Sequence, residues 1–265
     1  MRRAATRLGP VSTPADLSTA GTGVPPALGV LLGLDGVVHV SDLPVQSFAR
    51  HLGETLPVDR ARTLIACMRG FLEGKPDLIP AGIELVDAED GYQAVEIVAR
   101  ALGVAAPQSA AARRASRLDL AGSAWTIDPA DGLDDLLAAL AGQAWVAVLT
   151  EPGDPAAGAV LDAVGAGWLV VQVIDQPMPA AVAAMQHRID ARTDAGRVLV
   201  VGASWADELR VAHGQGCVTA LVDRYGAGVG TPTWRAAGLG DLVGPVRQWL
   251  CRASTRRSSD ARDVR

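Results

Sequence analysis

Five short apolar segments alternate with helical patterns along this chain, and this alternation constrains the fold more than any other feature. The five segments are 28–34, 145–150, 168–174, 197–202 and 217–223. A strand that is apolar along its whole length is buried on both faces, as in a parallel sheet covered by helices. We therefore predict an α/β fold with a doubly wound parallel sheet and a Rossmann-like core.

The alternation is interrupted between the first and the second apolar segment. Residues 41–121 contain helical patterns and no convincing buried strand, so we expect a helical module inserted directly after the first strand. The core then comprises residues 28–40 and 122–250. Residues 1–27 are rich in Pro, Gly, Ser and Thr, and residues 251–265 are polar and basic, so both are expected to be flexible arms.

Composition excludes several classes of protein. With 49% hydrophobic residues and a net charge of −5, the chain is neither wholly disordered nor a typical nucleic-acid binder, which would carry an excess of basic residues. No segment approaches the roughly 18 apolar residues of a membrane span, and the N-terminal residues lack the apolar stretch of a signal peptide. Cys67, Cys217 and Cys251 lack the spacing of a zinc site or a disulfide framework, which fits a cytoplasmic protein.

The carboxyl ends of the strands are the candidate site, because open α/β sheets bind ligands there. The first strand leads into LLGLDGVV (31–38), the second ends at Thr150, the third is followed by QPMP (176–179), and the fourth leads into GASWAD (202–207). In this order, with a helical module after the first motif, residues 28–250 resemble the haloacid dehalogenase (HAD) superfamily. The resemblance implies a HAD-like core with an inserted helical cap at residues 41–121.

The residues that this resemblance assigns to catalysis are largely replaced. Gly33 stands in the position of the nucleophilic Asp, Gln176 in that of a Lys that neutralises phosphate charge, and Ala203 in that of an Asp that binds Mg²⁺. The family's motif residues that remain are Asp35, an acid/base, Thr150, a phosphate-binding hydroxyl, and Asp207, a second acidic residue. The expected pocket comprises Gly33, Asp35, Gly36, Thr150, Gln176, Ala203, Ser204 and Asp207.

These replacements point away from the family's reaction. Loss of a nucleophile costs on the order of 10⁴–10⁶ in rate, and Mg²⁺ usually requires one or two carboxylates. We therefore interpret the chain as a pseudo-phosphatase that uses no metal and binds a small phosphorylated metabolite or a protein partner, with no nucleic-acid or membrane partner. Two alternatives stay open: an active hydrolase on a small phosphorylated metabolite, with Asp35 as acid/base and Mg²⁺ as cofactor, and a structural or interaction subunit.

Two further groups of residues have more than one interpretation. Ser204 lies between a strand and a helix, as in a serine-hydrolase nucleophile elbow, but no acid and His follow it in the order that such a triad requires. Asp87, Glu89 and Asp90 precede a helical pattern. They are interpreted as charges at a helix N-terminus, where the helix dipole favours them, or else as cap residues that face the cleft.

Overall fold

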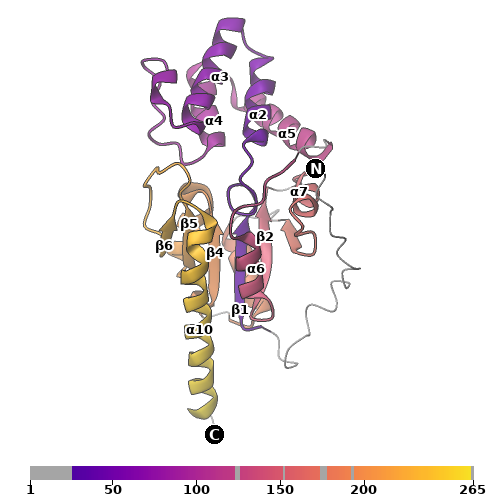
Figure 1. The fold of residues 1–265 in the computed structure, drawn as a ribbon, viewed down its shortest axis with the longest axis vertical. Coiled ribbons are helices and arrows are strands. Elements are labelled where there is room, and N and C mark those ends of the chain that lie inside the picture. Colours follow the sequence, from indigo (N-terminus) through magenta and orange to yellow (C-terminus); the bar gives the residue numbers. More distant parts are fainter. Residues whose placement is uncertain (1–25, 123–125, 152, 174–177, 192–193, 264–265) are drawn as a thin grey trace, which may run out of the picture.

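A six-stranded parallel sheet forms the centre of the molecule in the computed structural model (Figure 1). The structure describes residues 26–263 except 123–125, 152, 174–177 and 192–193. The strands are β1 (Leu28–Gly33), β2 (Ala144–Thr150), β3 (Val170–Val173), β4 (Val198–Gly202), β5 (Val218–Val222) and β6 (Trp234–Ala236). Their order is β3-β2-β1-β4-β5-β6, and all neighbours are parallel. The predicted parallel α/β fold is confirmed.

Successive residues of a strand point to opposite sides of the sheet, so strands that are apolar along their whole length make both faces apolar. Helices cover both of these faces. The core helices are α6 (Leu133–Leu140), α7 (Ala157–Ala163), α8 (Met178–Arg188), α9 (Arg210–Gly214) and α10 (Leu239–Asp263). Val30 and Leu32 of β1 belong to a cluster with residues of α6, α7 and α10. Leu31, between them, belongs to a second cluster with residues of α8 and α9. The central strand is thus buried on both faces, as its apolar sequence predicted.

Four longer helices lie between β1 and β2 in the chain and form a separate unit. They are α2 (Leu43–Gly53), α3 (Val58–Leu72), α4 (Gly91–Ala101) and α5 (Ala106–Gly122). This helical insertion, residues 43–122, has its own apolar core around Phe48, Leu64 and Val95. In Figure 1 the insertion lies beyond the end of the sheet at which β1 runs into α2.

The structure differs from the sequence-based expectation at two places near the C-terminus. β6 is a strand that the apolar pattern did not indicate, because it has only three residues and none of them is buried. Helix α10 continues to Asp263, whereas a flexible arm was expected from residue 251. The N-terminal arm lies almost entirely outside the described residues. None of the helices in the described part of the chain has the length and hydropathy that a membrane crossing requires.

Candidate functional site

The strands that carry the candidate residues are direct neighbours. β1 lies between β2 and β4, with Gly33 opposite Leu149 and Leu32 opposite Val201. Since all three strands are parallel, their carboxyl ends meet at one edge of the sheet. This brings the segment after Gly33, Thr150 and the turn after β4 to the same edge. The Thr150 hydroxyl donates a hydrogen bond to the backbone carbonyl of Glu151 at 3.1 Å. Gln176 lies outside the described residues.

Asp35 follows β1 and is held by a guanidinium and an imidazole ring. Its Oδ1 and Oδ2 accept hydrogen bonds from Arg117 Nη1 at 2.9 and 3.1 Å. The ring Nε2 of His39 lies 2.7 Å from Oδ1. Burial alone would raise the pKa of Asp35, but the Arg117 guanidinium and the His39 ring hold it well below its usual range. Asp35 is therefore an ionised carboxylate at any physiological pH.

Arg117 lies on α5 of the helical insertion and reaches across to the core. Besides Asp35, its Nε and Nη2 donate to the two oxygens of Asp154 at 3.0 and 2.5 Å. Asp154 lies between β2 and α7, so one guanidinium connects the helical insertion with the ends of β1 and β2. The sequence analysis did not identify Arg117 or Asp154. The chain has many arginines, and nothing in the pattern of α5 distinguishes this one.

The space beside Gly33 is filled by the carboxylate of Glu208. Glu208 belongs to a π-helical turn, η3 (Trp205–Leu209), which follows β4. A Cβ atom on Gly33 would lie 2.5 Å from Glu208 Oε1, a separation that real Cβ atoms essentially never show. Oε2 accepts hydrogen bonds from the backbone N–H groups of Ala203 at 2.7 Å and Ser204 at 3.1 Å. A carboxylate from the turn after β4 thus occupies the space into which a side chain at position 33 would project.

The surroundings of Glu208 favour its protonated form. Burial raises the pKa of this carboxyl to about 7, the two backbone N–H donors oppose the rise, and the Asp90 and Asp35 carboxylates add to it. Glu208 therefore exchanges a proton near neutral pH. Sequence reasoning missed this residue, although one signal was present. Gly33 and Gly202 are both glycines, and a Cβ atom on either would collide with the Glu208 carboxylate. The Cβ on Gly33 would lie 2.5 Å from Oε1, and the Cβ on Gly202 would lie 2.6 Å from Oε2.

Glu89, from the loop before α4, docks on the turn after β4. Its side chain is buried, with 6% of the residue exposed. Its carboxylate accepts hydrogen bonds from Ser204 Oγ at 3.1 Å and from the backbone N–H groups of Trp205 and Ala206. Neighbouring Asp90 instead accepts from Gln93 N at 2.8 Å and caps α4. Asp90 is therefore an acidic group at a helix N-terminus, and Glu89 is a residue of the helical insertion that faces the cleft.

Ser204 and Asp207 are joined to the helical insertion by one amide. Gln93 Nε2 donates to Ser204 Oγ at 3.1 Å and to Asp207 Oδ2 at 2.9 Å. Ser204 Oγ also accepts from the backbone N–H of Asp207 at 3.1 Å, so Ser204 caps the π-helical turn. Ser204 is 3% exposed. It has the contacts of a structural cap and lies too deep for a serine nucleophile.

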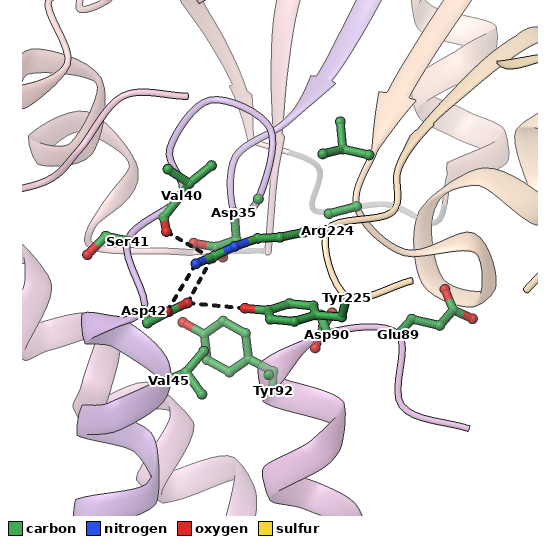
Figure 2. Close-up of a pocket in the computed structure, with 14 residues that line it drawn as sticks. Asp35, Val40, Ser41, Asp42, Val45, Glu89, Asp90, Tyr92, Arg224 and Tyr225 are labelled. Carbon is green, nitrogen blue, oxygen red and sulfur yellow. Dashed lines mark hydrogen bonds and ion pairs between the residues drawn. The ribbon is translucent and has the colours of Figure 1, made fainter. Parts of the chain in front are cut away.

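A cleft of about 50 Å³ separates the helical insertion from the strand ends (Figure 2). Asp35, Gly36 and Ala203 line its core side, and Glu89 to Tyr92 line the side of the insertion. Gly36 has a φ of +78°, and a Cβ there would lie 2.6 Å from Ala203 Cβ, so only glycine fits this approach. Gly33, Thr150, Ser204 and Asp207, which were expected in the pocket, are not among the residues that line this cleft.

An ion pair lies among the residues that line the cleft. Arg224 donates to the two oxygens of Asp42 at 2.8 and 3.1 Å, and the hydroxyl of Tyr225 donates to Asp42 at 3.1 Å (Figure 2). Burial raises the pKa of Asp90, which also lines the cleft, to about 6. Charged groups around the cleft are thus mostly acidic, and Arg224 is the basic residue among those that line it.

The resemblance to HAD proteins implies Mg²⁺, and the residues at the strand ends do not fit this ion. Mg²⁺ requires a near-octahedral set of oxygen ligands, usually with one or two carboxylates. Gly33 and Ala203 offer none, both Asp35 oxygens accept from Arg117, and Glu208 Oε2 accepts from two backbone N–H groups. Among the described residues, no group of three or more His, Cys, Asp or Glu side chains is arranged to hold a metal.

The parallel sheet and the helical insertion after β1 form the arrangement that the resemblance to HAD proteins implies. Comparison with solved structures agrees. A HAD-like hydrolase from Xanthomonas campestris has 16% sequence identity and a TM-score of 0.51, with 87% of this chain and 99% of that one covered. A predicted phosphoglycolate phosphatase from Haemophilus somnus has 16% identity and a TM-score of 0.53, with 82% and 97% covered. No protein-family model and no curated protein matches the sequence. The chain therefore has the HAD-like hydrolase fold.

Proposed function

We propose that this chain is a HAD-like protein without phosphatase activity, in which the cleft at the strand ends serves binding. The observation that carries the proposal is the Glu208 carboxylate in the space beside Gly33. A nucleophile on β1 would have to project into that space. A side chain from another element fills it and is held there by the N–H groups of Ala203 and Ser204. The site is thus packed for stability at the point where the family's covalent chemistry needs an unhindered carboxylate.

The contacts of Asp35 argue against the alternative of an active hydrolase. A general base works best when its pKa lies near the operating pH. Arg117 and His39 hold the pKa of Asp35 well below its usual range, which makes the carboxylate a weak base. Both oxygens of Asp35 also accept hydrogen bonds from Arg117, so a water molecule would have to compete with the guanidinium for them. These contacts suit a structural carboxylate.

We propose further that the helical insertion acts as a cap over the bound ligand or partner. Glu89, Gln93 and Arg117 all bridge from the insertion to the strand ends. The present cleft of about 50 Å³ has room for a few water molecules, so a metabolite-sized ligand requires the insertion to move. We propose a small phosphorylated metabolite or a segment of a protein partner as the ligand. If neither binds, the chain is a structural subunit.

We predict that the purified protein, supplied with Mg²⁺, hydrolyses aryl phosphates no faster than the contaminant level. The physical reason is the absence of a carboxylate nucleophile at position 33, which costs on the order of 10⁴–10⁶ in rate. The measurement is steady-state release of the aryl alcohol, compared between the wild type and D35N. Equal background rates in both proteins are expected. Robust turnover that D35N abolishes would refute the proposal and identify Asp35 as the acid/base of an active hydrolase.

A thermal-shift series with phosphorylated metabolites then separates a ligand binder from a structural subunit. A ligand that binds only the folded state adds about 2.7 kcal/mol at a hundredfold excess over its dissociation constant. R224A serves as the matched variant, because Arg224 is the cation that lines the cleft. Loss of the shift in R224A would place an anionic ligand there, and the absence of any shift favours the structural role.

A further inference from the structure

The turn after β4 presents four consecutive backbone N–H groups to two carboxylates. The first two donate to Glu208, which belongs to the same turn. The next two, from Trp205 and Ala206, donate to Glu89 of the helical insertion. The Ser204 hydroxyl donates to the same Glu89 carboxylate at 3.1 Å. Successive N–H groups that converge on one carboxylate form a concave site for anions, and here a side chain of the insertion occupies that site.

Of the two carboxylates, Glu89 is the one that can leave the turn. Glu208 is tied to its donors by the short chain between them. Glu89 comes from the loop that precedes α4, and most of this loop has little packing around it. Glu84 and Asp87 are exposed, and Val86 is 75% exposed. A segment with few buried contacts opens at a low cost in free energy, so the loop can withdraw Glu89 without unfolding the insertion.

Withdrawal of Glu89 would leave three donors in need of an acceptor. Ser204 is 3% exposed, and Trp205 and Ala206 are only partly exposed, so water reaches these groups poorly. A buried donor without a partner carries its full desolvation cost. An anionic group that takes the position of the Glu89 carboxylate removes this cost. The turn therefore favours exchange of one anion for another over an empty site.

We propose that Glu89 is an internal stand-in for an anionic group of the ligand, which displaces it from the N–H groups of Trp205 and Ala206. The inference rests on the proposed function, because it names the chemistry by which the cleft holds its ligand. The anionic group is a phosphate or a carboxylate, since either accepts several N–H groups at once. Arg117 can keep its contacts with Asp35 while Glu89 moves, so no second carboxylate is left unpaired. The contact of Glu89 with the turn is thus autoinhibitory.

The proposal predicts that removing Glu89 strengthens the binding of inorganic phosphate. A site that is available for only a fraction of the time has an apparent dissociation constant raised by the inverse of that fraction. We expect E89A to bind phosphate at least about tenfold more tightly than the wild type does, because its donors are always available. Calorimetry at pH 7, with chloride added to keep the ionic strength constant, measures both affinities. Acetate in place of phosphate tests whether a carboxylate is accepted as well.

A second readout locates the bound anion. In E89A, phosphate should shift the backbone amide resonances of Trp205 and Ala206, since these N–H groups gain a new acceptor. The same resonances should move little in the wild type at the same phosphate concentration. Phosphate that binds E89A without shifting either resonance would place the anion elsewhere and contradict the proposal.

Matched variants separate release of the N–H groups from loss of negative charge. E84A removes an exposed carboxylate of the same loop and should match the wild type. D90N removes a carboxylate that lines the cleft but leaves the turn covered by Glu89, and its asparagine can still cap α4. D90N should therefore gain much less affinity than E89A. Equal gains in D90N and E89A would show a general effect of charge and overturn the proposal.

Two further outcomes would also overturn it. Equal phosphate affinity in the wild type and E89A would show that Glu89 does not compete with the anion. If E89A does not fold, E89Q removes the charge with a smaller change of shape, and failure of both variants to fold would show that the Glu89 contact is structural. Phosphatase activity of the wild type would instead refute the proposed function and leave the comparison with E89A intact.

Discussion

Replacing Gly33 by aspartate is expected to lower the free energy of unfolding by about 5 kcal/mol, and to restore no catalysis. The new Cβ would lie 2.5 Å from Glu208 Oε1, so either Glu208 or β1 must shift. The new carboxylate would also face a second buried carboxyl. Overpacking costs about 1–3 kcal/mol, and an unpaired buried charge adds about as much again. Chemical denaturation of the wild type and G33D measures the loss.

A second substitution tests whether Glu208 causes this loss. E208A opens the space beside position 33, so G33D/E208A should be more stable than the sum of the two single losses predicts, by about 2 kcal/mol. G158A is the matched glycine control. Gly158 lies in α7 with no atom within 4 Å of an added Cβ, and alanine is favoured in a helix by about 0.5–1 kcal/mol. Strict additivity of G33D and E208A would show that the two positions do not compete for the same space.

The fold was predictable because its signals are local. Five of the six strands are apolar segments long enough to be recognised, and the helical insertion interrupts them at one place. β6 could not be predicted, since its three residues include exposed Arg235 and gain their place only by pairing with β5. The extension of α10 past Leu250 was missed because its sequence is mostly polar and has no continuous apolar stripe to indicate a buried face.

The site was predictable only as far as topology determines it. Parallel strands bring their carboxyl ends to one edge, so Asp35 and the turn after β4 could be placed together from the sequence. The groups that now fill this edge are Arg117, Glu89 and Glu208. Two of them come from the helical insertion, and its orientation over the sheet is a tertiary property that no local pattern encodes. The third, Glu208, lies one residue beyond Asp207, the acidic position that the resemblance identifies.

Two acidic groups at the strand ends, Asp35 and Glu89, each have a partner from a different element. Asp35 pairs with α5, Glu89 with the turn after β4, and Glu208 with the backbone of that turn. A buried charge that is paired in this way destabilises the fold less than an isolated one. When one member of a pair is removed, the remaining charge is buried without a partner and carries the full desolvation cost. The pairs therefore hold the helical insertion against the core. Glu208 is the exception, because its partners Ala203 and Ser204 belong to its own turn and burial raises the pKa of its carboxyl.

This exception predicts that the protein becomes less stable as the pH rises from 5 to 9. Burial raises the pKa of Glu208 from 4.5 to about 7, so the folded state binds this proton more tightly than the unfolded state does. The contribution of Glu208 is then fully present below pH 4.5 and is lost as the pH rises through 7. A displacement of this size corresponds to about 3 kcal/mol. Asp35 adds no slope in this range, since its lowered pKa leaves it ionised in both states.

The E208Q variant isolates the effect. Its amide oxygen can accept the same N–H groups of Ala203 and Ser204 without a charge, so E208Q should exceed the wild type by about 3 kcal/mol at pH 9 and match it near pH 4.5. D90N controls for Asp90, whose pKa of about 6 adds a slope of the same sign at lower pH. The measurement is the free energy of unfolding of the wild type and both variants across this range. A wild type whose stability rises between pH 5 and 9, or an E208Q profile parallel to that of the wild type, would mean that Glu208 is ionised in the folded protein throughout.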